Sequence, residues 1–586
     1  MSNSLPIRIA MAVLALCIAT APTRADWPSS ATVNLPVCTS PNLQSGHAIA
    51  SDLAGGVFIA WNDLRNGVDT DVYAQHVLST GVIDPVWPVH GVAITALLGA
   101  QNGPKIISDG SGGAYLAWQD FRTGSAATSD VYAQHLRSDG TVDPAWPANG
   151  LAVCTAAGQQ ASVNLLSDEA GGAIVAWRDL RNDTDLFAAR VLSNGQLDPA
   201  WAVNGNPIVS GAGGQNNMVL APDGHGGLIA TWTDTRNGAS ADIYAQRLLQ
   251  NGSIAPGWPV NGIAVCTAVG LQQIPDIAPD AAGGAFIGWE DYRPGLTADI
   301  YIHHLRANGT LDPTWPADGS LACAAGGNQT RASVAAGAAG GVFAAWIDAR
   351  SGSIPALYAQ HLLANGSLDP AWPVADLNFC AAFGNHSGLV VLPDGSGGAL
   401  VVWDDRRDGG VADVYAHHLL STGAADAAWP VNGRGVSVAT GSQSGAGAVL
   451  ADGSGGLIVA WTDSRTFTTS NNDIYAQRVQ ANGTLGGSVL DVPQGRVTGL
   501  ELAPLAPTPA RSDRLGLRYT LPRAGHVQLE LLDVAGRMLA VHDLGIQSAG
   551  PHAFDWAPQT RVHAGLQFVR LRFGGDTRTV RAVIVE

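Results

Sequence analysis

The residues with the clearest chemical potential in this chain are aspartates and arginines held at a fixed spacing. The pattern Trp-x-Asp-x-Arg occurs eight times, beginning at Trp61, Trp118, Trp177, Trp232, Trp289, Trp346, Trp403 and Trp461. It supplies the pairs Asp63 with Arg65, Asp120 with Arg122, and Asp291 with Arg293. An arginine beside carboxylates can form paired, charge-assisted hydrogen bonds. Such a cluster either braces a loop or offers a polar surface to a ligand.

A second aspartate follows each pattern in seven copies, and Ala356 replaces it in the sixth. These aspartates are Asp71, Asp130, Asp185, Asp242, Asp299, Asp413 and Asp473. We predict that the arginine lies between the two carboxylates and braces the loop, because bracing is needed in every copy whereas catalysis usually needs one asymmetric site. The alternative is a ring of carboxylates that holds Ca²⁺ or a polar ligand, since oxygen ligands suit Ca²⁺. No other cofactor is indicated.

The residue between aspartate and arginine varies along the repeats, as it does on a binding surface built upon a constant scaffold. It is Leu64, Phe121, Leu180, Thr235, Tyr292, Ala349, Arg406 and Ser464. Phe121 and Tyr292 could stack on a sugar or an aromatic side chain, and ordinary loop packing is the alternative. The predicted binding residues are therefore these two aromatic residues and the three Asp–Arg pairs named above.

Motifs of known catalytic chemistry are missing from the sequence. There is no Gly-x-Ser-x-Gly elbow, no His-Glu-x-x-His zinc motif and no P-loop. Glycosidase chemistry needs two carboxylates facing one cleft. The two glutamates within the repeats, Glu169 and Glu290, lie in separate copies. No catalytic residue is predicted.

The repeated unit predicts the fold. A turn of the form Asp-x-x-Gly-Gly precedes the tryptophan pattern, with Gly337 in place of aspartate in the sixth copy, and the unit recurs about every 57 residues. One unit contains four short β-rich runs bounded by turn residues: 164–166, 173–177, 186–191 and 207–209. Four strands per repeat with tryptophan and glycine landmarks are typical of a propeller blade. The fold class is therefore all-β.

The two ends of the repeat region complement each other. The eighth copy lacks its last segment, and residues 26–40 carry the missing pieces, Trp27-Pro28 and Pro36-Val37-Cys38-Thr39. We predict an eight-bladed β-propeller over residues 26–492, whose last blade is completed by the N-terminal strand. Such closure removes exposed sheet edges.

The remaining recurrent residues are expected to serve structure. The tryptophans and the tyrosine of the third strand should fill the space between blades, with an aromatic ligand cage as the alternative. The Gln-His and Gln-Arg pairs should form hydrogen bonds on the blade surface, because adjacent strand residues point to opposite faces. Five cysteines share one position in different copies, too far apart for disulfides: Cys38, Cys154, Cys266, Cys323 and Cys380.

Charge and the N-terminal segment restrict the partners and the compartment. The net charge is −17, with 31 basic and 48 acidic residues among 586, which argues against nucleic acid as a partner. Residues 1–25 have the charged start, short apolar stretch and small residues of a secretory signal peptide. No later stretch is long and apolar enough to span a membrane. The protein is therefore expected to be secreted or displayed on the outer cell surface.

A different pattern follows the repeats. Residues 493–513 contain several prolines and are predicted to form a linker. Residues 514–586 alternate apolar and polar side chains in several runs, which predicts half-buried strands of a small sandwich.

This last region resembles a known family. The matching residues are Pro507-Thr508-Pro509, Tyr519-Thr520-Leu521-Pro522, Asp533-Val534-Ala535-Gly536-Arg537, Gly550-Pro551-His552, Trp556 and Ala564-Gly565-Leu566-Gln567-Phe568. They are similar to the C-terminal sorting domain of type IX secretion substrates and to the hook-capping-type immunoglobulin-like domain. The resemblance implies an immunoglobulin-like fold and, as a partner, export machinery. The repeats resemble uncharacterised repeats of bacterial secreted proteins.

Eightfold repetition without a unique catalytic set favours a non-catalytic binding or structural propeller, and so leans against an enzyme. The alternative is a secreted polysaccharide hydrolase or lyase with its site in the propeller channel. A purely structural surface-layer component is a third hypothesis. An extracellular glycan or protein is the expected ligand, and the oligomeric state stays open.

Overall fold

The computed structural model describes residues 26–487 and 501–585 with short gaps. The gaps are 125–127, 239, 294, 324, 338–339, 353, 468–470, 505–509, 512–514, 522–524, 534–536, 548–549, 557–564 and 574–575. The predicted signal peptide lies outside the described residues. The described part is all-β, and it contains no helix that is long and apolar enough to cross a membrane.

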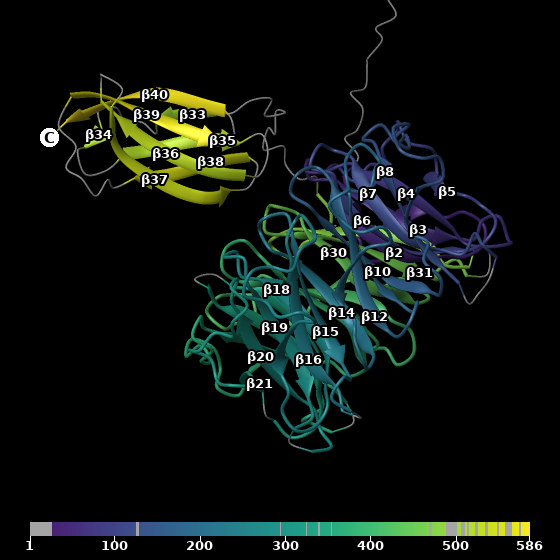
Figure 1. Cartoon of the computed structure of the whole chain (residues 1–586). Coiled ribbons are helices and arrows are strands. Elements are labelled where there is room, and N and C mark those ends of the chain that lie inside the picture. Colours follow the sequence, from purple (N-terminus) through teal and green to yellow (C-terminus); the bar gives the residue numbers. More distant parts are fainter. Residues whose placement is uncertain are drawn as a thin grey trace, which may run out of the picture.

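The repeats form eight four-stranded antiparallel sheets among the described residues (Figure 1). The first four consist of β2 (Gln44–Ser51), β3 (Val57–Asp63), β4 (Asp71–Val77), β5 (Val92–Thr95); β6 (Gln101–Ser108), β7 (Ala114–Asp120), β8 (Asp130–Leu136), β9 (Leu151–Cys154); β10 (Gln160–Ser167), β11 (Ala173–Asp179), β12 (Asp185–Val191), β13 (Asn206–Val209); and β14 (Gln215–Pro222), β15 (Leu228–Asp234), β16 (Asp242–Leu248), β17 (Ile263–Cys266).

The other four sheets have the same order. They consist of β18 (Gln272–Pro279), β19 (Ala285–Asp291), β20 (Asp299–Leu305), β21 (Ser320–Cys323); β22 (Gln329–Ala336), β23 (Val342–Asp348), β24 (Ala356–Leu362), β25 (Leu377–Cys380); β26 (His386–Pro393), β27 (Ala399–Asp405), β28 (Asp413–Leu419), β29 (Arg434–Ser437); and β30 (Gln443–Ala451), β31 (Leu457–Asp463), β32 (Asp473–Val479) with β1 (Leu35–Cys38).

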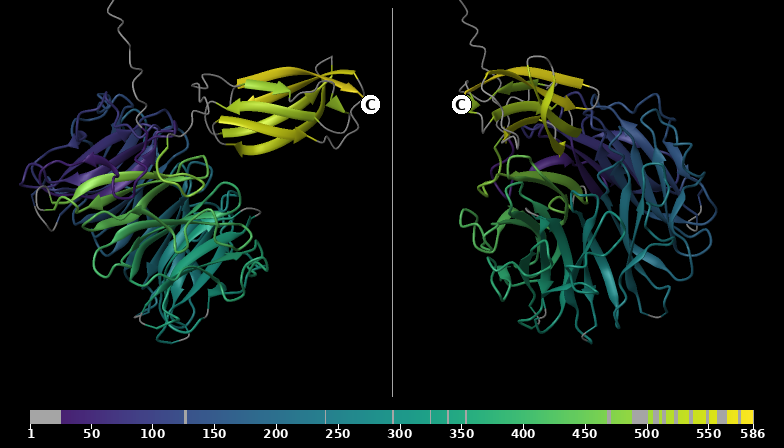
Figure 2. Two further views of the ribbon diagram at one scale, coloured as in Figure 1. Left: turned by 180° about the vertical axis from the view of Figure 1, so that it is seen from behind. Right: turned by 60° about the vertical axis from the view of Figure 1, so that its left-hand side comes forward.

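The N-terminal strand completes the eighth sheet, as the sequence predicted. Strand β1 pairs with β32, and Leu35 lies opposite Ala476 in an antiparallel register. The first strand of each sheet contacts the first strands of the two neighbouring sheets, including β2 with β30. The sheets therefore close into the ring of a β-propeller (Figure 2).

Tryptophans fill the space between neighbouring sheets. The eight tryptophans of the repeated pattern are fully buried, and Trp61 packs with Ile458 and Ala460 of the eighth sheet. The five described cysteines are buried and free, as predicted. Large rings buried between sheets supply much of the apolar area that stabilises such a fold.

In seven of the eight sheets an aspartate fixes the turn between the first and second strands. Asp52 Oδ1 accepts hydrogen bonds from the backbone N–H groups of Ala54 at 2.7 Å and Gly56 at 2.8 Å. A Cβ on Gly56 would lie 2.4 Å from the Val77 carbonyl oxygen, so only glycine fits there. These turns lie on one face of the ring, which we call the turn face, whereas the Asp–Arg loops lie on the opposite face, which we call the loop face.

The C-terminal region forms two further sheets. The three-stranded sheet has the order β33 (Glu501–Pro504), β35 (Leu515–Leu521), β38 (Gly550–Trp556), and the five-stranded sheet has the order β34 (Ala510–Arg511), β40 (Asp576–Val585), β39 (Gly565–Phe573), β36 (Gly525–Leu532), β37 (Met538–Gln547). Buried residues of β35, β36 and β39 form one apolar core. The predicted strand alternation is confirmed, whereas the immunoglobulin-like identity and the sorting role stay predictions.

The predicted linker is too long at its C-terminal side. Strand β33 lies inside residues 493–513 and pairs with β35, and the short β34 pairs with β40. Leu502 packs against the apolar core of this region, which explains why a proline-rich segment is held in a sheet.

Candidate functional site

The Asp–Arg pairs of the loop face form internal braces. Asp63 is fully buried, and its Oδ2 accepts a hydrogen bond of 2.7 Å from Trp61 Nε1. Arg65 donates from Nε to Asp63 Oδ1 at 2.9 Å and from Nη2 to Oδ2 at 2.6 Å. The guanidinium also stacks 3.7 Å from the ring centre of Tyr73. One aspartate thus joins a tryptophan, an arginine and, through the arginine, the third strand.

The other predicted pairs have the same geometry. Arg122 donates to Asp120 at 2.6 Å, and Arg293 donates to Asp291 at 2.6 Å, with both carboxylates fully buried. In all eight copies the guanidinium lies over an aromatic ring of the third strand. The structure therefore places these predicted binding residues in braces within the loops.

The second aspartate does not share the arginine, so that part of the prediction is wrong. Arg65 Nη2 also donates to the His90 carbonyl at 2.8 Å, which directs the guanidinium away from Asp71. Asp71 instead accepts a hydrogen bond of 3.1 Å from Asn66 Nδ2. Burial, with a smaller contribution from neighbouring carboxylates, raises the pKa of Asp71 to about 6. Burial raises the pKa of Asp299 and Asp413 to about 6 as well.

The two predicted stacking residues are half-buried on the loop face. Burial, followed by the charge of Glu290, raises the pKa of Tyr292, whose hydroxyl lies within hydrogen-bonding reach of Gln273 and Glu290. Glu290 in turn accepts a hydrogen bond of 2.8 Å from the backbone N–H of Arg331 in the next sheet. Tyr292 thus belongs to a contact between sheets five and six. Stacking of Phe121 or Tyr292 on a sugar stays a prediction.

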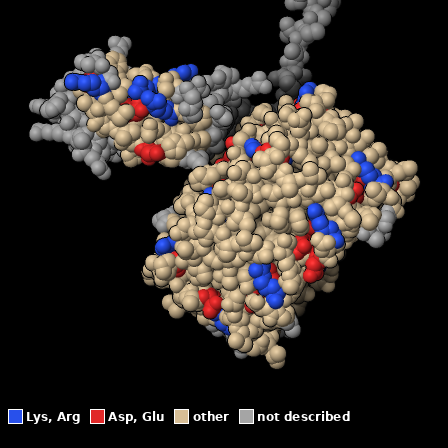
Figure 3. Space-filling model, viewed as in Figure 1, with Lys and Arg blue, Asp and Glu red and all other residues tan. Residues whose placement is uncertain are grey.

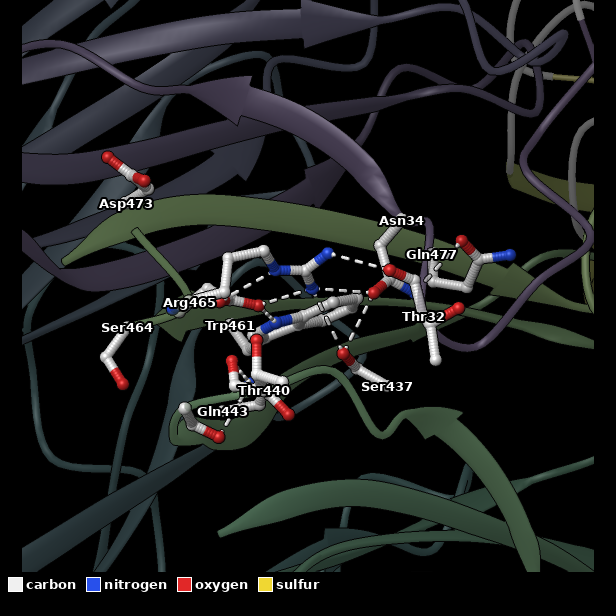
Figure 4. A network of polar contacts seen from close by, with 12 residues as sticks. Thr32, Asn34, Ser437, Thr440, Gln443, Trp461, Ser464, Arg465, Asp473 and Gln477 are labelled. Atoms are coloured by element: carbon white, nitrogen blue, oxygen red, sulfur yellow. Dashed lines mark hydrogen bonds and ion pairs between the residues drawn. The ribbon is translucent and has the colours of Figure 1, made fainter. Parts of the chain in front are cut away.

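In the eighth copy the N-terminal segment takes part in the brace (Figure 4). Arg465 Nη2 donates to Asp463 at 2.6 Å and to Asn34 Oδ1 at 2.7 Å. Ser437 Oγ also donates to Asn34 Oδ1, at 2.9 Å. Asn34 therefore links the start of the propeller to its last two sheets.

Histidines of the third strands form a second set of clusters, on the turn face. His76 Nδ1 lies 2.8 Å from Asp84 and its Nε2 lies 3.0 Å from the turn aspartate Asp52. The same pair of contacts occurs at His135, His304 and His418. Arg190 in the third copy also contacts two aspartates in this way. The predicted hydrogen bonding of these pairs is observed, but their placement on the blade surface is wrong, because Gln75 and His76 are buried.

His361, in the sixth copy, breaks this pattern. Its Nδ1 lies 2.8 Å from Asp369, but Gly337 stands where the other copies have the turn aspartate. Among the described residues, Nε2 has no hydrogen-bond partner. The residue is only 8% exposed, and its ring packs 4.5 Å from that of Phe343. Burial raises the pKa of Asp369, but hydrogen bonds from Ala371 N–H and His361 outweigh it and lower the pKa overall.

A hollow of about 300 Å³ opens beside His361 on the turn face, between the sixth and seventh sheets. Its lining residues are Gly341, His361, Leu363, Ala364, Asp369, Ser396, Gly397 and Ser421. The volume lies at the lower end of the range for small-molecule sites. His361 lines this hollow and is oriented by a carboxylate, while its Nε2 is buried beside Gly337 and Gly341. Such an imidazole can accept a proton when a bound molecule reaches Nε2.

The sequence contained the signal for this site. The replacement of aspartate by Gly337 is visible in the repeats. Its consequence requires the contact between the turn aspartate and the third-strand histidine, which are 24 residues apart in the first copy. The site is also not in the propeller channel, where the hydrolase or lyase hypothesis placed it, since apart from His361 near the end of β24 its lining residues lie in the connections between strands.

The sequence matches no protein-family model and no curated protein. Similar solved structures include an ulvan lyase of a new polysaccharide lyase family, with 9% identity over 68% of this chain and 95% of that one, at a TM-score of 0.40. The Penicillium chrysogenum α-L-arabinanase has 12% identity over 65% and 94%, at 0.32. The Fusarium graminearum α-L-arabinofuranosidase has 11% identity over 56% and 94%, at 0.31.

The comparisons contradict the function that the sequence favoured. The prediction of a non-catalytic binding or structural module is wrong against them, because the similar structures named above are enzymes that process polysaccharides. At this identity and TM-score the likeness concerns the fold, and it assigns no residue of this chain.

Proposed function

We propose that the protein is a glycan-processing enzyme and that His361 is its proton acceptor. The observation that carries this proposal is His361, a buried imidazole that lines a hollow and whose Nε2 has no hydrogen-bond partner among the described residues. Catalysis needs an asymmetric site, and this copy alone combines a third-strand histidine with a turn that lacks aspartate.

Asp369 prepares the imidazole for this role. Its carboxylate accepts the Nδ1 proton of His361 at 2.8 Å, which leaves the lone pair on Nε2. A neutral imidazole in this tautomer can take a proton from a water molecule or from a substrate atom. The first reaction belongs to a hydrolase and the second to a lyase.

The lining of the hollow suits a sugar. Ser396 and Ser421 contribute hydroxyl groups, and Leu363 and Ala364 contribute small apolar surfaces. Sugars present both hydroxyl groups and apolar C–H faces, so they need this mixture. The described lining residues include no arginine or lysine to neutralise a uronate. A neutral glycan therefore fits this lining better than a uronate does.

Export belongs to the same proposal. The segment 1–25 is proposed to direct the chain out of the cytoplasm, and the C-terminal sandwich is proposed to engage export machinery. The side of the propeller drawn in Figure 3 carries dispersed charges rather than one basic field, which is compatible with an uncharged polymer as substrate.

The test is a screen of neutral polysaccharides for released reducing ends, followed by two variants. We expect His361→Gln to lower turnover by a factor of 100 or more, on the order of a lost general base. Gly337→Asp should also abolish turnover, because it restores the carboxylate that binds Nε2 in other copies. His76→Gln, in the first copy, is the matched control and should keep the activity. Unchanged turnover in both site variants contradicts the proposal.

A further inference from the structure

The seventh copy differs from all others at the first residue of its inner strand. Seven copies carry glutamine there, namely Gln44, Gln101, Gln160, Gln215, Gln272, Gln329 and Gln443, whereas the seventh carries His386. The side chain of His386 is fully buried, and neither ring nitrogen makes a well-formed hydrogen bond. A buried polar group without a well-formed hydrogen bond destabilises the folded state, so His386 indicates a position where a ligand binds.

The glutamines show that a polar side chain at this position lacks a full set of partners within the described part of the chain. In all seven copies the glutamine Oε1 is buried and without a hydrogen-bond partner. A water molecule could satisfy an amide oxygen of this kind. His386 replaces the amide with an imidazole, and an imidazole nitrogen binds metal ions far more readily than an amide oxygen does.

Two further metal-binding side chains meet His386. Cys380 ends strand β25 of the sixth sheet, and Asp405 ends strand β27 of the seventh. One ligand atom from each of the three residues lies within 4.8 Å of the other two, and all three residues are buried. The closest pair, His386 Nδ1 and Asp405 Oδ2, is 3.3 Å apart.

Sulfur, imidazole nitrogen and carboxylate oxygen are the ligands that zinc prefers in proteins. Zinc bonds of about 2.0–2.3 Å in a tetrahedron place ligand atoms roughly 3.3–3.8 Å apart. The histidine–aspartate pair already has this spacing. The remaining pairs need a contraction of about 1.0–1.5 Å at most by the same geometry.

One neighbouring charge opposes the ion. Arg407 Nη2 donates to Asp405 Oδ2 at 2.7 Å and lies 3.7 Å from Cys380 Sγ. A zinc ion would share the aspartate with this guanidinium, so the affinity should be lower than at a site without an arginine. The second carboxylate oxygen can keep the contact with Arg407 Nε, which is 3.0 Å long.

We propose that Cys380, His386 and Asp405 bind one zinc ion that joins the sixth and seventh sheets. The ion would lie between the sixth and seventh sheets. In the other copies, hydrogen bonds and packing alone hold the neighbouring sheets together at the equivalent position. This site is separate from the hollow at His361, so the two proposals can fail independently.

The first experiment measures bound metal in the mature full-length protein by mass spectrometry. We expect one zinc per chain, with loss of zinc in His386→Gln and in Cys380→Ser. Both variants place residues that other copies carry at the same position, since glutamine occurs seven times and Ser437 stands at the cysteine position of its copy. Both variants are therefore expected to fold. Cobalt should give a thiolate charge-transfer band in the wild type and no band in Cys380→Ser.

The reciprocal experiment builds a second site. Gln44→His adds histidine beside Cys38 and Asp63, so this variant should bind two zinc ions. Gln101→His is the matched control and should bind only one, because Thr95 stands at the cysteine position beside it. A wild type without zinc or a cobalt band overturns the proposal, as does unchanged zinc in His386→Gln.

Discussion

Asn34 Oδ1 accepts a hydrogen bond of 2.7 Å from Arg465 Nη2, which joins residues 431 positions apart in the sequence. Asn34 also donates to the Val436 carbonyl at 3.0 Å and is only 3% exposed. The side chain therefore connects the N-terminal strand to the last two sheets, and the closed ring depends on this connection.

Asn34→Ala should lower the free energy of unfolding by about 2 kcal/mol, because it removes a buried amide that contacts Arg465, Ser437 and the Val436 carbonyl. Urea denaturation followed by tryptophan fluorescence measures this change. Thr32→Ala is the control, since the Thr32 side chain is exposed and Arg465 contacts only its carbonyl. Equal stabilities of the two variants would show that Asn34 does not hold the ring closed.

Asp63→Asn should lower the free energy of unfolding by about 3 kcal/mol, since it breaks an ion pair with Arg65 in which the carboxylate is fully buried. The loss of charge also weakens the hydrogen bond from Trp61. Thermal unfolding of the variant would check this expectation. An unchanged Tm would mean that the arginine stacking on Tyr73 alone secures the loop.

Asp71→Asn should have the opposite effect at neutral pH. Burial raises the pKa of Asp71, so its charge opposes folding above about pH 6. The sixth copy has Ala356 at this position, which shows that the fold does not require the carboxylate. The variant should have a higher Tm than the wild type at pH 8 and a similar Tm at pH 5. A lower Tm at pH 8 would contradict the expectation.

The pH dependence of stability follows from several such groups. Asp71, Asp299 and Asp413 hold protons in the folded state up to about pH 6, so stability falls as the pH rises through that range. His135 and His304 act in the same direction. Burial lowers their pKa values, but contacts with two carboxylates each outweigh it and raise them, and that stability is lost above their folded pKa values.

Low pH should also destabilise the protein, through a different set of aspartates. Hydrogen bonds outweigh burial and lower the pKa of Asp109 and Asp394 to about 2, so their contribution is lost as the pH falls from about 4. We therefore expect the highest Tm near pH 5 in a calorimetric series from pH 3 to pH 8. A Tm that rises steadily from pH 5 to pH 8 would contradict these signs.

The amino-acid sequence by itself determined the repeated sheets, the closure by residues 26–40 and the structural role of Trp61 and Cys38. These features are local or repeat eight times, so strand alternation, turn glycines and spacing reveal them. The extent of the linker was not determined, because Leu502 enters the C-terminal core only when the sandwich assembles.

Only the tertiary structure decided what the polar residues do. The sequence cannot show that Arg65 turns toward His90 rather than Asp71, because that choice depends on a carbonyl 25 residues away. Nor can it show that the glycine at position 337 leaves His361 Nε2 without the aspartate that other copies provide. It also cannot show that His386 lies close to Cys380 of the neighbouring sheet. Hydrogen bonds and metal coordination act over about 2–4 Å, so they depend on which strands the ring brings together.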